Sequence, residues 1–197
     1  MPGAASVTVA VEGKHDEPVA RRIIAHVGLT TQVVYVAGGK VPLDAKLPGY
    51  NNAAKGAPWL VLRDFDHDAP CARALIAAKL ARPAPLMRLR FPVRSIESWL
   101  LADAERIAAF LSVPVGKIPT SPDGEAHPKL TLVNIARRSR KKAIRDDMAP
   151  AEGTSAIVGP GYTSRIIEYA SVHWRPGTAA RRSPSLARCI AALESLK

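Results

Sequence analysis

Cysteine is scarce in this sequence, and its scarcity excludes two common ways of stabilising a small fold. The 197 residues contain two cysteines, Cys71 and Cys189, which lie far apart without Cys-x-x-Cys or histidine-rich spacing around either. This pattern supports neither a disulfide framework nor a zinc site. We therefore expect a reduced, cytoplasmic protein.

Long apolar runs are also missing. The first residues do not form the basic and then hydrophobic segment of a signal peptide, and no later segment is long enough to span a bilayer. The sequence therefore predicts a soluble, unexported protein with no membrane partner.

Acidic residues are too few to balance the basic ones. Asp and Glu number 17 against 28 Lys and Arg, so the formal charge is +11. Such an excess favours polyanionic partners, with nucleic acid first, although it also serves solubility or binding to ribosomal or acidic proteins. A chain of this length, with 47% hydrophobic residues, is expected to build one core with an extension.

The clearest motif is an apolar run that ends in alternating acids. Residues 59–62 predict a buried strand, and Asp64, Asp66 and Asp68 follow its C-terminal end. Because side chains two residues apart in an extended chain point the same way, Asp64 and Asp66 should converge. Their repulsion is relieved by a proton or a cation, and Mg²⁺ or Mn²⁺ suits oxygen ligands. In the alternative interpretation, Asp66 or Asp68 caps the following helix.

Strands alternate with helices over the first hundred residues. We expect strands at residues 6–11, 31–37, 59–62 and 87–93, each followed by a helical segment. This alternation predicts right-handed βαβ units and an α/β fold with a mostly parallel four-stranded sheet flanked by helices. Functional sites in such sheets form at the carboxyl ends of the strands.

Acidic residues follow three of the expected strands. Glu12 comes after the first, Asp64 and Asp66 follow the third, and Glu97 lies just beyond the fourth. These acids should therefore share one edge of the sheet. Asp16 lies in the first turn of the helix after the first strand, where helix capping is the alternative to metal binding.

The sequence Gly38-Gly39-Lys40 follows the second expected strand. It is similar to part of a phosphate loop, but it lacks the upstream glycine and the Ser or Thr after lysine that such a loop needs. We interpret it as a turn.

Beyond residue 103 the pattern changes to helices and turns. Helices are expected at residues 104–111, 130–136, 162–172 and 183–196, the last capped by Ser183 with Pro184 at its first position. We therefore divide the chain into a metal-binding α/β domain at residues 1–103 and a basic helical extension at residues 104–197 that packs on it.

The helical extension carries a cluster that we name the basic run. Its members are Arg137, Arg138, Arg140, Lys141 and Lys142. On a basic protein, this run is the best single candidate for contacts with nucleic-acid phosphates. The alternative is a solvated helix face.

Several stretches resemble the TOPRIM fold of topoisomerases, primases and the nucleases of the overcoming-lysogenization-defect (OLD) family. Those for the fold are Glu12-Gly13, Asp64-Phe65-Asp66 and the acid after the next strand, Glu97, and those for a closer resemblance are residues 11–17, Arg94-Ser95-Ile96-Glu97-Ser98-Trp99-Leu100-Leu101-Ala102-Asp103, residues 132–140 and residues 183–186. Together they look like the bacterial TOPRIM-like family catalogued as domain of unknown function 4276, and the resemblance covers nearly the whole chain. The stretch from Arg94 to Asp103 is the most specific.

This resemblance implies a metal-binding α/β domain in which Glu12, Asp64 and Asp66 match the TOPRIM acids. Asp16 and Glu97 match additional acids of the OLD-type nucleases. Because relatives of this kind are often encoded beside an ATPase, the resemblance also implies an ATPase partner and a role in defence or DNA processing.

Our leading hypothesis is Mg²⁺- or Mn²⁺-dependent cleavage of phosphodiester bonds in nucleic acid. Glu12, Asp64 and Asp66 would bind one metal ion, while Asp16 and Glu97 would help to bind a second or orient the water. These five acids are the expected metal ligands.

Three other residues are candidates for supporting roles. Arg94 would neutralise the developing charge on the phosphate, or it would form an ion pair with one of the acids. Lys129 is the candidate for the lysine that some TOPRIM nucleases carry. His67 would move a proton, or it lies in the loop without a role.

Two other functions fit the same residues. A catalytically idle TOPRIM-like subunit would use its basic face to dock nucleic acid or an ATPase, and a chelator would not affect its binding. Nucleotidyl transfer, as in primases, would keep the metal, but the sequence shows no motif for a nucleotide-base pocket. Two features argue against a topoisomerase: no tyrosine nucleophile is placed on a separate DNA-binding domain, and the chain is too short to form a strand-passage gate.

Overall fold

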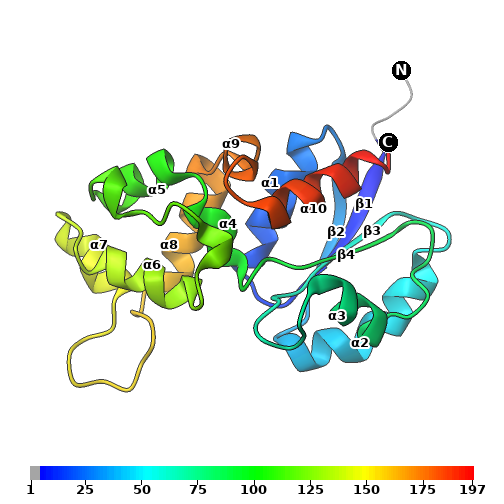
Figure 1. Ribbon diagram of the computed structural model, residues 1–197, viewed down its shortest axis with the longest axis horizontal. Helices are drawn as coiled ribbons and strands as arrows, with labels where there is room; N and C mark the ends of the chain where they lie inside the picture. The colour runs from blue at the N-terminus through cyan, green and yellow to red at the C-terminus, as the bar shows by residue number, and fades with distance from the viewer. Residues whose placement is uncertain (1–4) are drawn as a thin grey trace.

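The computed structural model describes residues 5–197 and has an α/β architecture. Four parallel strands form one sheet in the order β2-β1-β3-β4. The strands are β1 (Ser6–Val11), β2 (Thr30–Val36), β3 (Trp59–Leu62) and β4 (Met87–Arg90). Helices lie on both faces of the sheet (Figure 1), so the predicted fold class is confirmed and the sheet is parallel throughout.

Helices make up most of the remaining structure. Those between the strands are α1 (Asp16–His26), α2 (Lys40–Ala53) and α3 (Ala72–Lys79). Those after β4 are α4 (Ile96–Leu101), α5 (Ala104–Leu111), α6 (Pro128–Ala136), α7 (Lys142–Met148), α8 (Tyr162–Glu168), α9 (Pro176–Ala180) and α10 (Pro184–Glu194). Two 3₁₀ turns, η1 (Val115–Lys117) and η2 (Pro122–Gly124), and one π turn, η3 (Tyr169–His173), complete the chain. Across residues 5–197, none of the helices has the length and apolar character that a membrane crossing requires.

Side-chain alternation along the strands divides the interior into two cores. Val9 of β1 and Leu60 of β3 belong to the core that α1 and the C-terminal helices cover. Ala10 of β1 and Val61 of β3 belong to the core that α2 and α3 cover. Because both faces of the sheet are covered, the central strands are continuously apolar, which explains the run Trp59–Leu62.

Two tryptophans connect the helices after β4 to one another and to the first core. The Trp99 side chain of α4 is fully buried, and its Nε1 donates to Ser185 Oγ at 2.7 Å. Its carbonyl oxygen accepts from Trp174 Nε1 at 3.1 Å. Ser183 caps α10 as expected, accepting a hydrogen bond from the Leu186 N–H. In Figure 1, α4 to α9 gather beside the sheet, and α10 returns across it.

Helix α3 begins later than expected, and its cap is not an aspartate. The N-cap residue is Cys71, whose Sγ accepts from the Ala74 N–H at 3.5 Å. The interpretation of Asp66 or Asp68 as the helix cap is therefore wrong. Both carboxylates contact other groups.

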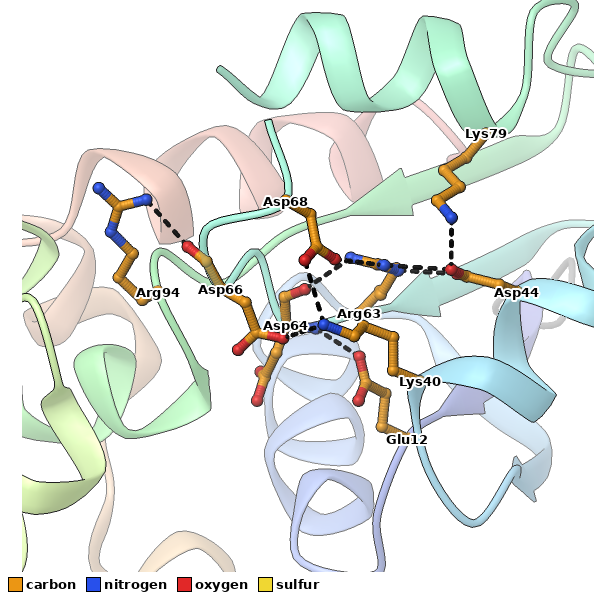
Figure 2. A network of polar contacts seen from close by, with 9 residues as sticks. All are labelled: Glu12, Lys40, Asp44, Arg63, Asp64, Asp66, Asp68, Lys79 and Arg94. Carbon is orange, nitrogen blue, oxygen red and sulfur yellow. Dashed lines mark hydrogen bonds and ion pairs between the residues drawn. The ribbon is translucent and has the colours of Figure 1, made fainter. Parts of the chain in front are cut away.

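A buried guanidinium anchors the loop that follows β3. Arg63 is 1% exposed, and its Nε and Nη2 donate to the two carboxylate oxygens of Asp44 at 2.7 and 3.1 Å. Nη2 also donates to Asp68 at 2.6 Å, and Nη1 donates to the Asp64 carbonyl at 2.9 Å. Burial opposes the charge of Asp44, but the hydrogen bonds from Arg63 and Lys79 keep the pKa of Asp44 below its ordinary value. Figure 2 shows this network.

We predict that Asp44→Asn lowers the free energy of unfolding by about 1.5–3 kcal/mol at neutral pH, because a buried guanidinium loses charge-assisted hydrogen bonds. The pKa of Asp44 is lowered in the folded state, so this stabilisation is complete above the ordinary pKa of 3.8 and is lost as pH falls through the lowered value. Urea denaturation of both proteins over a series of acidic and neutral pH values measures the difference.

Asp146→Asn is the matched control, because Asp146 pairs with Lys142 on the surface. It should change the free energy of unfolding by less than about 0.5 kcal/mol. A stability difference for Asp44→Asn that is as small at neutral pH would contradict the role of the Arg63 network.

Candidate functional site

Five carboxylates gather at the carboxyl edge of the sheet. Glu12 follows β1, Asp16 begins α1, Asp64 and Asp66 follow β3, and Glu97 lies in the first turn of α4. Parallel strands end at the same edge, which brings together acids that are far apart in sequence. Asp64 links three of these segments: its N–H donates to Glu12 Oε1 at 2.9 Å, and its Oδ1 accepts from the Ile96 N–H at 3.0 Å.

Burial disfavours the ionised forms of Glu12 and Asp64. It raises the pKa of Glu12 to about 7 and raises the pKa of Asp64 well above its ordinary value. The nearby charges of Glu97, Asp16, Glu12 and Asp66 raise the pKa of Asp64 further. Mutual repulsion of this kind is relieved when a proton or a cation enters the cluster.

The Asp16 side chain does not accept a hydrogen bond from an N–H group of helix α1. Its Oδ2 accepts from the Gly13 N–H at 2.8 Å, and His15 holds the N-cap position of α1. Its Oδ1 is buried, accepts no hydrogen bond within residues 5–197, and lies 3.2 Å from His15 Nε2. The pKa of Asp16 is raised, chiefly by burial. Asp16 therefore offers one buried oxygen whose nearby polar group is the His15 ring.

Glu97 is fully buried and is oriented by hydroxyl groups that the sequence analysis did not identify. Ser95 Oγ donates to Glu97 Oε2 at 2.5 Å, and the Tyr162 hydroxyl donates to Oε1 at 2.8 Å. Burial, assisted by Glu97, raises the pKa of Tyr162 well above its ordinary value, so this hydroxyl remains a donor. The Ser95 hydroxyl thus donates to Glu97 and does not accept a hydrogen bond from an N–H group of α4.

Lys129, the first-turn lysine of α6, faces the same carboxylate. Its Nζ lies 3.6 Å from Glu97 Oε1. Burial opposes the charge on Lys129, but the carboxylates of Glu97 and Asp64 outweigh it and raise the lysine's pKa. The structure therefore places the lysine suggested by the resemblance beside the acids.

Lys40 is a site residue that the sequence analysis missed. Its Nζ lies 2.7 Å from Asp66 Oδ2 and 3.1 Å from Asp68 Oδ1 (Figure 2). The hydrogen bond that Lys40 donates to Asp66 is the largest of the contributions that raise the pKa of Lys40. The expected turn is present, since the N–H groups of Gly38 and Gly39 donate to the Glu12 carbonyl at 2.9 and 3.0 Å. That turn directs the lysine after it toward the acids.

A cleft of about 520 Å³ opens beside the carboxylates. Its lining includes the acids Asp64 and Asp66, the cations Arg94, Lys129 and Arg137, the histidines His67 and His127, and the apolar Leu130 and Ile157. Cations across a cleft from buried acids provide the electrostatic environment that a phosphate needs.

Arg94 and His67 both line this cleft. Arg94 Nη1 donates to the Asp66 carbonyl at 2.9 Å, and its guanidinium carbon lies 5.6 Å from the centre of the Phe65 ring. Among the described residues it forms no ion pair with a carboxylate, so the structure does not show the alternative role expected for it. The His67 ring lies 5.9 Å from the ring of His127.

The basic run does not form one helix face. Helix α6 ends at Ala136 and α7 begins at Lys142, so most of the run lies in the turn between them. All five members are exposed. Arg137 lines the cleft beside the acids, whereas Lys141 lines a separate hollow with Arg106. Arg137 is therefore the member placed to contact a phosphate bound near the carboxylates.

The donor set suits a hard divalent ion in its chemistry. Its ligands are carboxylate oxygens, one of which, Asp16 Oδ1, is buried and accepts no hydrogen bond among the described residues, with His15 Nε2 3.2 Å away. Within residues 5–197, no group of three or more Asp, Glu, His or Cys side chains is arranged so that it could bind a metal ion as it stands. In this arrangement Asp66 contacts Lys40, and Glu97 accepts from Ser95 and Tyr162.

Comparison of the chain with protein-family profiles, curated proteins and solved structures finds no match. The relation to TOPRIM proteins stays a prediction from the residues quoted above. The functional interpretation of the site therefore rests on the residues and contacts described above.

We predict that Mn²⁺ raises the melting temperature of the protein. A ligand that binds only the folded state stabilises it by about 2.7 kcal/mol at a roughly hundredfold excess over Kd, which corresponds to about 5–10 °C for a chain of this size. Asp64→Asn keeps an oxygen for the Ile96 N–H but removes a buried charge. In chelator this variant should melt no lower than wild type, and in Mn²⁺ it should lose most of the shift. A wild-type protein indifferent to Mn²⁺ would contradict the metal site.

We also predict that Arg137→Ser weakens nucleic-acid binding and reduces the slope of log affinity against log salt by about one unit, because one phosphate contact is lost. Lys141→Ser removes the same charge at a position away from the cleft and should change the slope less. Fluorescence anisotropy with labelled oligonucleotides at several salt concentrations measures both. Equal slopes for wild type and Arg137→Ser would show that Arg137 contacts no phosphate and is a solvated surface residue.

Proposed function

We propose that this protein is a TOPRIM-like nuclease that cleaves phosphodiester bonds in nucleic acid with Mg²⁺ or Mn²⁺. The observation that carries the proposal is the cluster of buried, mutually repelling carboxylates around Asp64, at the edge of a cleft lined by cations. Carboxylates whose pKa values are raised by burial and by one another cluster at functional sites, and oxygen ligands of this kind suit a divalent ion.

The residues suited to bind the ion are Glu12, Asp16, Asp64 and Glu97, with Asp66 joining them when it separates from Lys40. A bound divalent ion would supply Lewis-acid stabilisation of the phosphate oxygens and would lower the pKa of a bound water. The hydroxyls of Ser95 and Tyr162 fix the orientation of Glu97 for this task.

The cations of the cleft act on the substrate. Arg94 has no carboxylate partner among the described residues, so its guanidinium is free to contact a phosphate oxygen. Lys129 lies between Glu97 and the cleft and would neutralise charge that develops on the leaving group. Arg137 would bind a neighbouring phosphate of the same strand.

The sequence resemblance supports two further parts of this proposal. One is an ATPase partner protein, and the other is a role in defence or DNA processing. The net charge of +11 supports a nucleic-acid substrate, because it favours encounter with a polyanion.

The decisive experiment is cleavage of plasmid DNA and of single- and double-stranded DNA and RNA oligonucleotides. Cleavage should require Mg²⁺ or Mn²⁺, and Glu12→Gln and Asp64→Asn should each lower the rate at least about tenfold to a hundredfold. Glu17→Gln is the matched control, because Glu17 follows Asp16 in α1 but pairs with Arg21 at the surface. It should cleave at the wild-type rate.

Two outcomes would overturn the proposal. If both site variants cleave as fast as wild type, the acids are not the catalytic site. If the protein binds nucleic acid in chelator but cleaves none of these substrates with either ion, a catalytically idle binding subunit explains the site better. Incorporation of nucleotides without cleavage would assign the site to nucleotidyl transfer.

A further inference from the structure

A second cavity, of about 570 Å³, lies away from the acids, between α3, β4 and α10. Its lining is mainly apolar and includes Ile76, Leu89, Phe91 and Ala192. Three arginines also line it: Arg73 from α3, Arg90 from β4 and Arg188 from α10. No aspartate or glutamate belongs to its lining among the described residues.

Arg90 is the least exposed of the three arginines that line this cavity, and its Nε has no hydrogen-bond partner among the described residues. Its Nη1 donates to the Leu89 carbonyl at 2.8 Å, but its Nε is buried and has no hydrogen-bond acceptor within residues 5–197. Burial lowers the pKa of Arg90, and the nearby charge of Arg88 lowers it further. The Arg90 side chain is partly buried and has no carboxylate partner among the described residues, so an anion in the cavity would offset its charge.

The nearby thiol of Cys189 does not supply that counter-charge. Cys189 is fully buried, and burial raises its pKa to about 12, so the thiol is neutral at physiological pH. Arg73 and Arg188 are exposed and form no ion pair among the described residues. The cavity therefore combines three guanidinium groups with no carboxylate to neutralise them.

From this combination we propose that the cavity binds a small organic anion, in which a phosphate or carboxylate group is joined to an apolar body. The guanidinium groups match the planar oxygens of either anion. The volume is typical of a small-molecule site, and so is an apolar lining with a few converging polar groups. This site is separate from the carboxylate cluster, and it does not depend on the proposed nuclease activity.

The test uses the fluorescent anion anilinonaphthalene sulfonate, which combines an acidic group with an apolar body. Its fluorescence should rise on binding to the wild-type protein and should fall when a competing ligand is added. Adenosine monophosphate and decanoate are the organic competitors, and they separate a phosphorylated ligand from a carboxylated one. Inorganic phosphate is the third competitor and should displace the probe much less well, because it has no apolar body to bury.

Two variants locate the binding site. Arg188→Gln removes an exposed cation and leaves the fold unstrained, and it should weaken probe binding about tenfold or more, as expected for loss of a charged hydrogen bond. Ala192→Phe fills the cavity without changing charge and should abolish binding. Arg181→Gln is the matched control, because Arg181 is an exposed arginine outside this lining, and it should bind like wild type.

Two results with these variants and competitors would contradict the proposed anion site. Probe binding that Arg188→Gln and Ala192→Phe both leave unchanged would place the probe elsewhere and overturn the site. Displacement by inorganic phosphate as strong as by the organic anions would overturn the requirement for an apolar body. Circular dichroism of each variant should match that of wild type, so that a loss of binding reports on the cavity.

Discussion

The burial of several carboxylates at one edge of the sheet is the constraint on which the rest of this structure depends. Asp16 and Glu97 are buried, and their charges raise the pKa of the neighbouring Asp64. Such a cluster destabilises the fold unless hydrogen-bond donors and cations offset the repulsion. Backbone N–H groups supply part of this compensation, since those of Asp64, Ile96 and Gly13 donate to three different carboxylates.

Cations from different parts of the chain supply the rest. Lys40 from α2 contacts Asp66 and Asp68, Arg63 from the end of β3 contacts Asp68 and Asp44, and Lys129 from α6 faces Glu97. The acids and bases alternate in one network, which Figure 2 shows for the residues near β3. In the proposed reaction, a divalent ion would replace part of this compensation, and the displaced lysines would be available to a phosphate.

The helices after β4 complete the site and do more than extend the sheet. Tyr162 of α8 and Lys129 of α6 both contact Glu97 of α4, so the helical part of the chain provides one of the carboxylates and two of the polar groups around it. The packing of Trp99 against Trp174 and Ser185 fixes these helices relative to one another. The same packing brings α10 back over β4, where it forms one wall of the arginine-lined cavity. Both candidate sites therefore depend on the same folding of the C-terminal half onto the sheet.

The sequence by itself determined the parts of this protein that arise from local periodicity. Apolar runs bounded by Gly, Pro and acids located the four strands, and their alternation with helices predicted the parallel α/β sheet. The same logic placed Glu12, Asp64, Asp66 and Glu97 after strand ends, because a parallel sheet must end its strands at one edge. Boundaries were less certain, as α3 shows, because Cys71 and not an aspartate caps that helix.

Only the tertiary structure decided which side chains meet. Tyr162 contacts Glu97 across 65 positions, and Lys40 contacts Asp66 across 26, and neither pair leaves a periodic signal in the sequence. The basic run looked continuous in sequence, but the turn between α6 and α7 sends Arg137 and Lys141 to different hollows. Local patterns record the burial and hydrogen bonding of each segment separately, whereas a site is made by side chains that become neighbours only when those segments pack.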